Sequence, residues 1–157
     1  MADQAVGNLS AGVFMDDIRS TIGGTNNYTP VSGDDDAWMF LEVAIAYNST
    51  DIFDTSDSYL GSALVCDLSD KVKWVAIKNL STTSTEGLGV SIGGDAAWNT
   101  STTMILGNGE MIIFKAPFLT AGDLHGKACT LDSDGKPTAQ GTATVTCQVA
   151  VILENVS

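Results

Sequence analysis

Alternating apolar and polar positions near the end of the chain give its clearest structural signal. Between Thr142 and Leu153, apolar residues from Ala143 onward occupy every second position, with threonines and Gln148 between the first of them. A period of two is expected of a strand with one buried face. The stretch is longer than a typical strand, so it suits a path across a whole sandwich or a strand that extends beyond its own domain.

Six shorter stretches also have strand character: residues 38–47, 59–65, 72–79, 88–92, 104–106 and 110–115. The first is a nearly unbroken apolar run, which is typical of a strand covered on both faces. Asn108-Gly109 lies between the last two and is a strong signal for a tight hairpin turn. Pro117 is expected to end the pairing of the two strands that flank this turn.

Short strands, frequent turns and few helix-forming segments predict an all-β protein, either an antiparallel β-sandwich or a jelly roll, with little helix. The composition changes near residue 37, so we divide the chain into an N-terminal arm, residues 1–37, and a sandwich domain, residues 38–157. With 157 residues the chain is large enough to fold around one core without disulfides or metals.

The arm is rich in Gly, Asn, Asp and Thr, and it contains one small apolar island. Phe14, Ile18 and Ile22 have the spacing of one face of a short helix, which Gly23-Gly24 would end. The island is too small to fold alone. Two readings stay open: the segment packs on its own domain, or it is an arm that docks on a neighbouring subunit or a capsid.

Acidic residues outnumber basic residues by 19 to 7, so the formal net charge is −12. Such a chain is repelled by phosphate backbones and anionic membranes, which we exclude as partners. The first residues, MADQAVGNLS, lack the basic start and apolar block of a secretion signal, and no apolar run has the length of a membrane span. We therefore expect synthesis in a cytoplasm with reduced thiols.

Residues that could carry chemistry are scattered, so we predict no enzyme, no metal site and no cofactor. His125 is the only histidine, and no G-x-S-x-G nucleophile motif accompanies it. The glycines between Gly87 and Gly94 lie in a strand pattern rather than before a helix, as a dinucleotide loop requires. Asp132-Ser-Asp134-Gly135 begins like a calcium loop but lacks the later ligands, so it predicts a tight turn between two strands.

The three cysteines do not form a disulfide pattern, because their number is odd and their spacing wide. If Asp134-Gly135 is a two-residue hairpin turn, Ser133 pairs with Lys136, and Cys129 and Cys147 are then several residues out of register. Cys147 is expected to be a buried, reduced core residue. Trp98 lies in a polar loop, where it could cover one end of the sandwich or serve as a contact residue.

The middle third of the chain resembles the β-sandwich decoration (cement) proteins of tailed-bacteriophage capsids. Three segments carry the resemblance: Ile77-Lys78-Asn79, Val90-Ser91-Ile92-Gly93-Gly94, and Ile105-Leu106 followed by the Gly107-to-Glu110 turn. The family often has a proline in that last turn, where this chain has Asn108-Gly109. The resemblance implies an oligomeric coat component, often a trimer, that binds assembled shells from outside.

The expected function is therefore structural: a virion protein on the capsid exterior that binds the major capsid protein, bridges capsomers and stabilises the shell. Phe14, Ile18, Ile22 and Trp98 are the candidate intersubunit or capsid contacts. The alternative is a carbohydrate-binding or adhesin-like β-sandwich of a virion or cell surface, in which Trp98 and Tyr59 would stack on sugars.

Overall fold

The computed structural model describes residues 4–15, 18–29, 36–47, 50–53, 57, 59–60, 65–92, 103–138 and 144–154. The chain divides into two compact units, residues 1–34 and 35–157. Strands dominate both, and the described residues contain a single short 3-10 turn, η1 (Ala121–Asp123). The prediction of an all-β antiparallel protein with little helix is confirmed.

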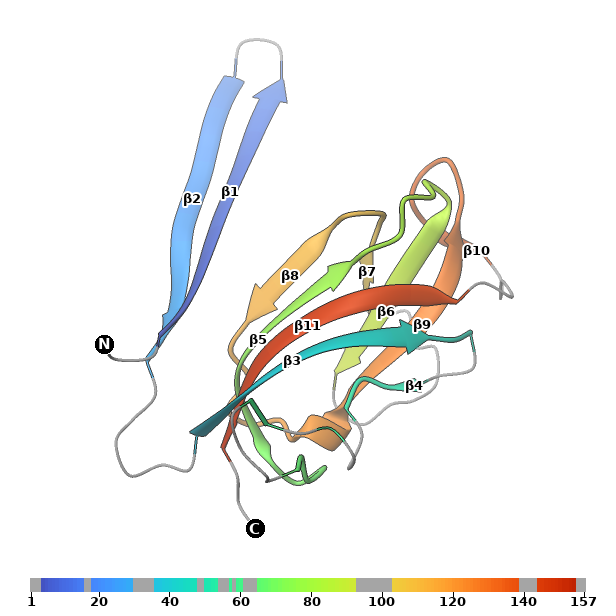
Figure 1. Cartoon of the computed structure of the whole chain (residues 1–157). Helices are drawn as coiled ribbons and strands as arrows, with labels where there is room; N and C mark the ends of the chain where they lie inside the picture. Colours follow the sequence, from blue (N-terminus) through green and yellow to red (C-terminus); the bar gives the residue numbers. More distant parts are fainter. Residues whose placement is uncertain are drawn as a thin grey trace. The chain divides into compact units, whose positions relative to one another are not determined.

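The second unit contains two antiparallel sheets (Figure 1). The four-stranded sheet has the order β3 (Asp36–Ile45), β11 (Val145–Glu154), β5 (Lys71–Asn79) and β8 (Met111–Phe114). The five-stranded sheet has the order β10 (Pro137–Thr138), β9 (Leu124–Leu131), β6 (Glu86–Ile92) and β7 (Thr103–Leu106), and β4 (Thr50–Asp51) also pairs with β9.

The strand pairs are nested, and this nesting defines a jelly roll. The first strand of the unit, β3, pairs with the last, β11, and inside that pair β4 pairs with β9, β5 with β8, and β6 with β7. One long antiparallel ribbon has thus been rolled up, which brings β11 beside β5 and β9 beside β6. Eight strands in two such sheets form the double Greek key of the jelly roll.

Alternate residues from both sheets fill the space between them with one hydrophobic core. The predicted face of β11 is confirmed from residue 145 onward, because its apolar positions are buried in this core. β11 lies between β3 and β5 and pairs with both of them along its length. The long strand is therefore used for pairing within the domain, and it does not extend beyond it. The fully buried core residues with the largest side chains include Met39, Ile45, Val75, Ile77, Leu88 and Leu124.

The Asn108-Gly109 turn is present, but the predicted hairpin is wrong. The Glu110 N–H donates to the Gly107 carbonyl at 3.1 Å, and Gly109 has φ 73°, which suits glycine. The strands on either side do not pair with each other: β7 joins β6 in one sheet and β8 joins β5 in the other. The local sequence fixes the chain reversal, but packing of the core decides that the chain crosses between the sheets.

Asn79, at the end of β5, ties this turn to both sheets. Its side chain is fully buried; Nδ2 donates to the Leu106 carbonyl at 3.1 Å and to the Glu86 carbonyl at 3.3 Å. Its Oδ1 accepts from the Ser81 N–H at 2.8 Å. Its backbone also makes two hydrogen bonds with the turn: the Asn79 N–H donates to the Glu110 carbonyl, and the Asn79 carbonyl accepts from the Gly109 N–H. One amide side chain thus satisfies backbone groups from three separate segments.

The turn after β9 also differs from its prediction by one residue. Pro137 pairs with Leu131 and Thr138 with Thr130, and Asp132 and Lys136 flank a three-residue loop rather than a two-residue turn. Gly135 has φ 75°, which fits a three-residue hairpin loop whose last residue is left-handed. The predicted register of this hairpin is wrong, although the prediction of a turn between two strands is confirmed.

The three cysteines are free and buried, as predicted for Cys147. Burial raises the pKa of the Cys129 and Cys147 thiols to about 11, and burial with nearby aspartates raises that of Cys66 to about 12. We expect thiol reagents to label none of them rapidly in the folded protein and all of them after unfolding, which mass spectrometry can count. Rapid labelling of Cys147 in native protein would contradict the assigned strand face.

The same thiols predict a loss of stability in alkaline solution. Their folded pKa values lie above the ordinary value of 9.0, so between about pH 9 and 11 the unfolded chain loses protons that the folded chain keeps. Stability is therefore expected to fall as pH rises through this window, and a variant with Cys147→Ala should lose part of that dependence. Urea unfolding at pH 8 and pH 10 measures it.

The first unit is a two-stranded antiparallel ribbon of β1 (Ala5–Met15) and β2 (Ile18–Tyr28). The short helix predicted from Phe14, Ile18 and Ile22 is wrong, because all three positions are in strands. In the ribbon register Ile18 and Ile22 share one face with the odd-numbered positions of β1, whereas Phe14 pairs with Arg19 on the other face. The spacing of Ile18 and Ile22 fits the period of two of a strand as well as the period of a helix, and pairing with β1 makes it a strand.

Candidate functional site

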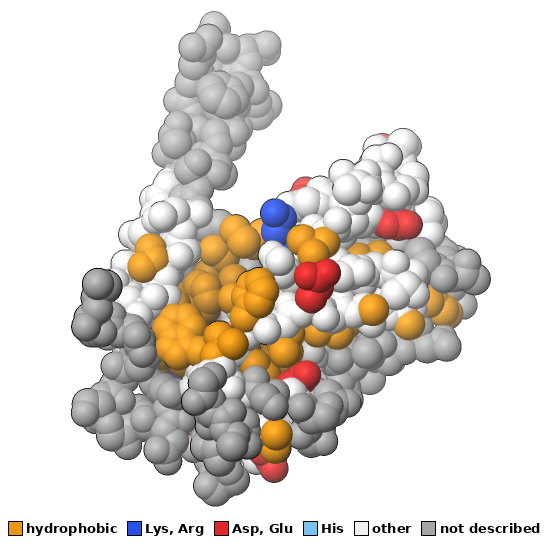
Figure 2. All heavy atoms as spheres, in the orientation of Figure 1, with side chains coloured by type: hydrophobic (Ala, Val, Ile, Leu, Met, Phe, Trp, Pro, Cys, Tyr) orange, Lys and Arg blue, Asp and Glu red, His pale blue; other side chains and the backbone are white. Residues whose placement is uncertain are grey.

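The outer face of the four-stranded sheet carries apolar side chains that do not belong to the core cluster. Register partners across the sheet face the same way, so Trp38, Ile152 and Trp74 form one row, in which Ile152 and Trp74 are buried. The next row contains Phe40, Ala150, Ala76 and Ile113, and it runs from the exposed Phe40 to the buried Ile113. Figure 2 shows hydrophobic side chains gathered over this sheet, with few charged groups among them.

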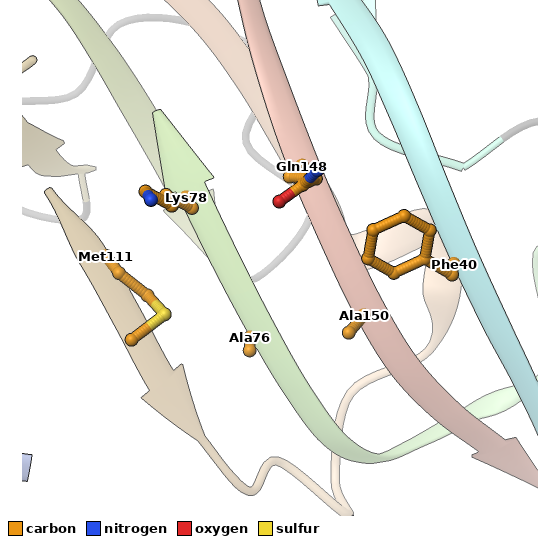
Figure 3. Close-up of a pocket in the computed structure, with 6 residues that line it drawn as sticks. All are labelled: Phe40, Ala76, Lys78, Met111, Gln148 and Ala150. Carbon is orange, nitrogen blue, oxygen red and sulfur yellow. The ribbon is translucent and has the colours of Figure 1, made fainter. Parts of the chain in front are cut away.

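Phe40 and Met111 are the most exposed apolar residues of this outer sheet face, at 53% and 46%. They lie on opposite edge strands and frame a shallow depression of about 100 Å³, which Ala76 and Ala150 floor (Figure 3). Pockets for small molecules are usually about 300–1,000 Å³. The depression is too small for that class of ligand.

The prediction that both faces of β3 are covered is corrected by Phe40. Met39 and Ile45 on the inner face are buried in the core, whereas the outer face leaves Phe40 half exposed. The apolar run of β3 therefore has one face in the core and one face on an apolar outer surface. Sequence analysis missed Phe40 because a run of this kind cannot say which of its faces is covered.

Charged side chains lie toward the ends of the outer sheet face. Lys78 borders the depression at one end, beside Met111 (Figure 3). At the other end the Lys73 ammonium lies 2.5 Å from the Glu154 carboxylate, and this hydrogen bond lowers the pKa of that carboxyl. Because both side chains reach solvent, the pair adds little stability. The apolar rows therefore have a charged border, as interface cores often do.

A second apolar surface lies at the end of the sandwich where β5 begins, and we call it the loop end. Phe118 is 97% exposed there, on the loop between β8 and η1. Leu68 lies on the adjoining loop, and its carbonyl accepts from the Gly122 N–H at 2.9 Å. Exposed apolar side chains that cluster on neighbouring loops are a sign of a contact surface. The residues of the loop end are Leu68 and Phe118.

A buried polar cluster fixes the loops beneath this surface. Tyr59 is 2% exposed, and its hydroxyl donates to the Asp70 carboxylate, which also accepts from the Asp67 N–H at 2.8 Å. Burial, with the bond to Asp70, raises the pKa of Tyr59 well above its usual value. Because it is buried, Tyr59 cannot stack on a sugar, and that part of the carbohydrate hypothesis is wrong. Its role is to hold the loop in place.

His125 has strand neighbours whose residue types are those of a catalytic triad. On β9 it lies between Asp51 of β4 and Ser91 of β6 in the strand register. Ser91 is only 7% exposed and lies inside a strand, whereas a nucleophilic serine must reach its substrate. We interpret these positions as a polar row across the sheet.

The remaining sequence candidates are explained by backbone structure. Oδ1 of Asp132 accepts from the N–H groups of Asp134 and Lys136 at 2.9 Å each, so this carboxylate stabilises the loop. Gly87 to Ile92 belong to β6 and do not open a helix. Among the described residues no group of three or more His, Cys, Asp or Glu side chains could hold a metal ion.

The predicted contact residues are only partly described. Trp98 lies outside the described residues. For Phe14, Ile18 and Ile22 the backbone places each position in the β1–β2 ribbon and pairs Phe14 with Arg19. Sequence analysis did not select Phe40, Met111 or Phe118, although Pro117 beside Phe118 marks a loop in which a large aromatic residue is unusual.

Comparisons with known proteins add no assignment. No protein-family model, curated protein or solved structure matches the chain. In the part of the chain that the structure describes, no helix has the length and apolar character needed to cross a membrane.

Proposed function

We propose that this protein is a structural component of a phage virion that binds the outside of the assembled capsid and stabilises the shell by bridging capsomers. The observation that carries the proposal is the apolar surface outside the core. Phe40, Met111 and Phe118 are exposed although the sandwich has a complete core of its own. Exposed apolar side chains that gather on one surface are a sign of a contact with another protein, and this supports the proposal.

The architecture and charge agree with this function. Jelly rolls are common in viral coat proteins, although they also occur in lectins and enzymes, so the fold alone does not decide. A net charge of −12 opposes contact with packaged DNA and is compatible with the solvent side of a shell. The expected partner is the major capsid protein, and the resemblance favours a trimer made in the host cytoplasm.

The segments that carry the resemblance have a structural role. Asn79, which ends the first segment, bonds with Gly109 and Glu110 of the last. The shared pattern therefore describes a device that joins the two sheets, and it supports a similar fold more directly than a similar contact surface. The contact surface is argued from Leu68 and Phe118 at the loop end.

We expect the double variant Leu68→Ser/Phe118→Ser to bind assembled shells at least about tenfold more weakly. Burial of a leucine or phenylalanine contributes roughly 1.5–3 kcal/mol each, and about 1.4 kcal/mol corresponds to a tenfold change. The measurement is co-sedimentation of the purified protein with shells that lack it. Phe118 is 97% exposed and Leu68 37%, so thermal unfolding of the variant is measured alongside, to separate lost binding from lost stability.

The matched control is Ser84→Ala/Ser133→Ala, which changes two exposed residues on loops at the opposite end of the sandwich. It should bind shells like the unmodified protein. Equal binding by the loop-end variant and the control would reject the loop end as the contact. Failure of the unmodified protein to bind any shell would reject the function itself.

A further inference from the structure

Asn108-Gly109 is the only Asn-Gly dipeptide of the chain, and this dipeptide is chemically reactive. The backbone nitrogen of the residue after an asparagine can attack the side-chain amide carbon, Cγ, and close a five-membered succinimide ring. Glycine favours this attack because it has no Cβ to hinder the ring and because its backbone rotates most freely. Asn108 and Gly109 are both exposed, so water can reach the reacting atoms.

The reaction takes up one water and releases one ammonia. The Gly109 nitrogen gives up its proton and bonds to Cγ of Asn108, the Cγ–Nδ2 bond breaks, and ammonia leaves with that proton. Water then opens the ring at one of its two carbonyl carbons. Opening at Cγ gives aspartate, whereas opening at the backbone carbon gives isoaspartate, in which the main chain runs through Cβ and Cγ and is one atom longer. Either product adds one negative charge at neutral pH.

The folded turn restrains the nitrogen that must attack. The Gly109 N–H donates to the Asn79 carbonyl at 3.1 Å, so the proton that must leave is held in a hydrogen bond. Two further bonds close the turn: the Glu110 N–H donates to the Gly107 carbonyl at 3.1 Å, and the Gly107 N–H donates to the Glu110 carboxylate at 2.6 Å. The attack therefore requires the turn to open first, and its rate depends on how often the turn opens.

A second exposed glycine turn provides a comparison within the same chain. Gly135, which follows Asp134, has φ 75° against 73° for Gly109, and its N–H also donates at 3.1 Å. Its acceptor is the Asp132 carbonyl, which belongs to the same loop. The acceptor of the Gly109 N–H is instead Asn79, a fully buried residue at the end of β5. The loop at Gly135 can open alone, whereas the turn at Gly109 must separate from a packed strand.

We propose that Asn108 is a site of spontaneous deamidation, that the hydrogen bond from Gly109 to Asn79 slows the reaction, and that isoaspartate at position 108 loosens the junction between the two sheets. The extra main-chain atom displaces the Gly109 N–H from the Asn79 carbonyl. Because Asn79 is buried, its carbonyl loses this donor where water does not easily replace it. Aspartate at the same position adds the charge but keeps the length of the main chain. This inference is independent of the proposed function.

Peptide mapping by mass spectrometry tests the site and its restraint. The full-length variant Asp134→Asn has two Asn-Gly dipeptides, and it is incubated in mildly alkaline buffer, both folded and in urea. In urea the two sites should react at similar rates. In the folded protein Asn108 should react at least about tenfold more slowly than position 134, since one hydrogen bond to a packed strand changes the opening by about that factor. The control Asn108→Gln should stay unmodified at position 108 in both states, because its amide would have to close a larger ring.

The stability of the separated products tests the consequence for the fold. Ion exchange isolates the more acidic forms of the otherwise unmodified protein, and peptide mapping identifies the isoaspartate form. That form should unfold at a lower urea concentration than the starting protein. The variant Asn108→Asp carries the same added charge without the longer main chain, so it should unfold at the same urea concentration as the starting protein.

Four results would overturn the inference. Absence of reaction at Asn108 in urea would reject the site. Equal rates at Asn108 in folded and unfolded protein, or equal rates at positions 108 and 134 in the folded variant, would show that the bond to Asn79 does not restrain the turn. An isoaspartate form as stable as the variant Asn108→Asp would show that the longer main chain does not loosen the junction between the sheets.

Discussion

Replacing Asn79 by alanine is expected to destabilise the sandwich by about 3–4 kcal/mol, because buried carbonyl and N–H groups then lose their partners at about 1–3 kcal/mol each. The three side-chain hydrogen bonds of Asn79 end on Leu106, Glu86 and Ser81. They connect β5 in one sheet with β6 and β7 in the other, so the loss affects the contact between the sheets. Urea denaturation measures the change in unfolding free energy.

The control is Lys78→Ala, one residue earlier on the same strand but exposed. Exposed substitutions usually change stability by less than about 0.5 kcal/mol. The comparison separates the hydrogen-bond network from any effect of strand propensity. A loss below about 1 kcal/mol for Asn79→Ala would show that water replaces the amide, and that Asn79 does not join the sheets as we describe.

Removing residues 1–35 is expected to leave the sandwich folded and to convert the proposed oligomer to a monomer. The core cluster contains no described residue of this segment, so the unfolding midpoint should change by no more than about 3–4 °C, which corresponds to about 1 kcal/mol for a domain of this size. Light scattering after size exclusion measures the mass, and thermal unfolding measures the stability of the same sample.

The substitution Ser10→Ala in the full-length chain is the control for this deletion, since it leaves the candidate contacts Phe14, Ile18 and Ile22 unchanged. It should retain the oligomer. If the deletion unfolds the sandwich, the ribbon is part of the domain and the division of the chain into an arm and a core is wrong. If the truncated protein remains an oligomer of the original size, the ribbon is not the link between copies.

The sequence predicted the strands better than their partners. The alternation near Val145 and Val149 identified both β11 and its buried face, because a period of two is a local property of the chain. Asn108-Gly109 identified a reversal, but not that the flanking strands join different sheets. That outcome depends on Asn79, about 30 residues away, which binds the turn, and no local pattern contains such a contact.

The contact surfaces were harder to predict for a related reason. Phe40 is part of an apolar run, and Phe118 follows a proline, so the sequence marks each as apolar without saying whether anything covers it. Exposure depends on how the two sheets and their loops assemble. The apolar island near Ile18 was misread as helical because the spacing of a few apolar residues fits both periods; pairing with β1 decided for the strand.

Imaging of virus particles tests the central claim most directly. Capsids assembled with and without this protein should differ by jelly-roll density on the outer surface at the junctions between capsomers, and the difference should return when purified protein is added. The shells without it should open at lower temperature. Identical outer surfaces in the two preparations, or density only inside the shell, would contradict a capsid-stabilising role on the exterior.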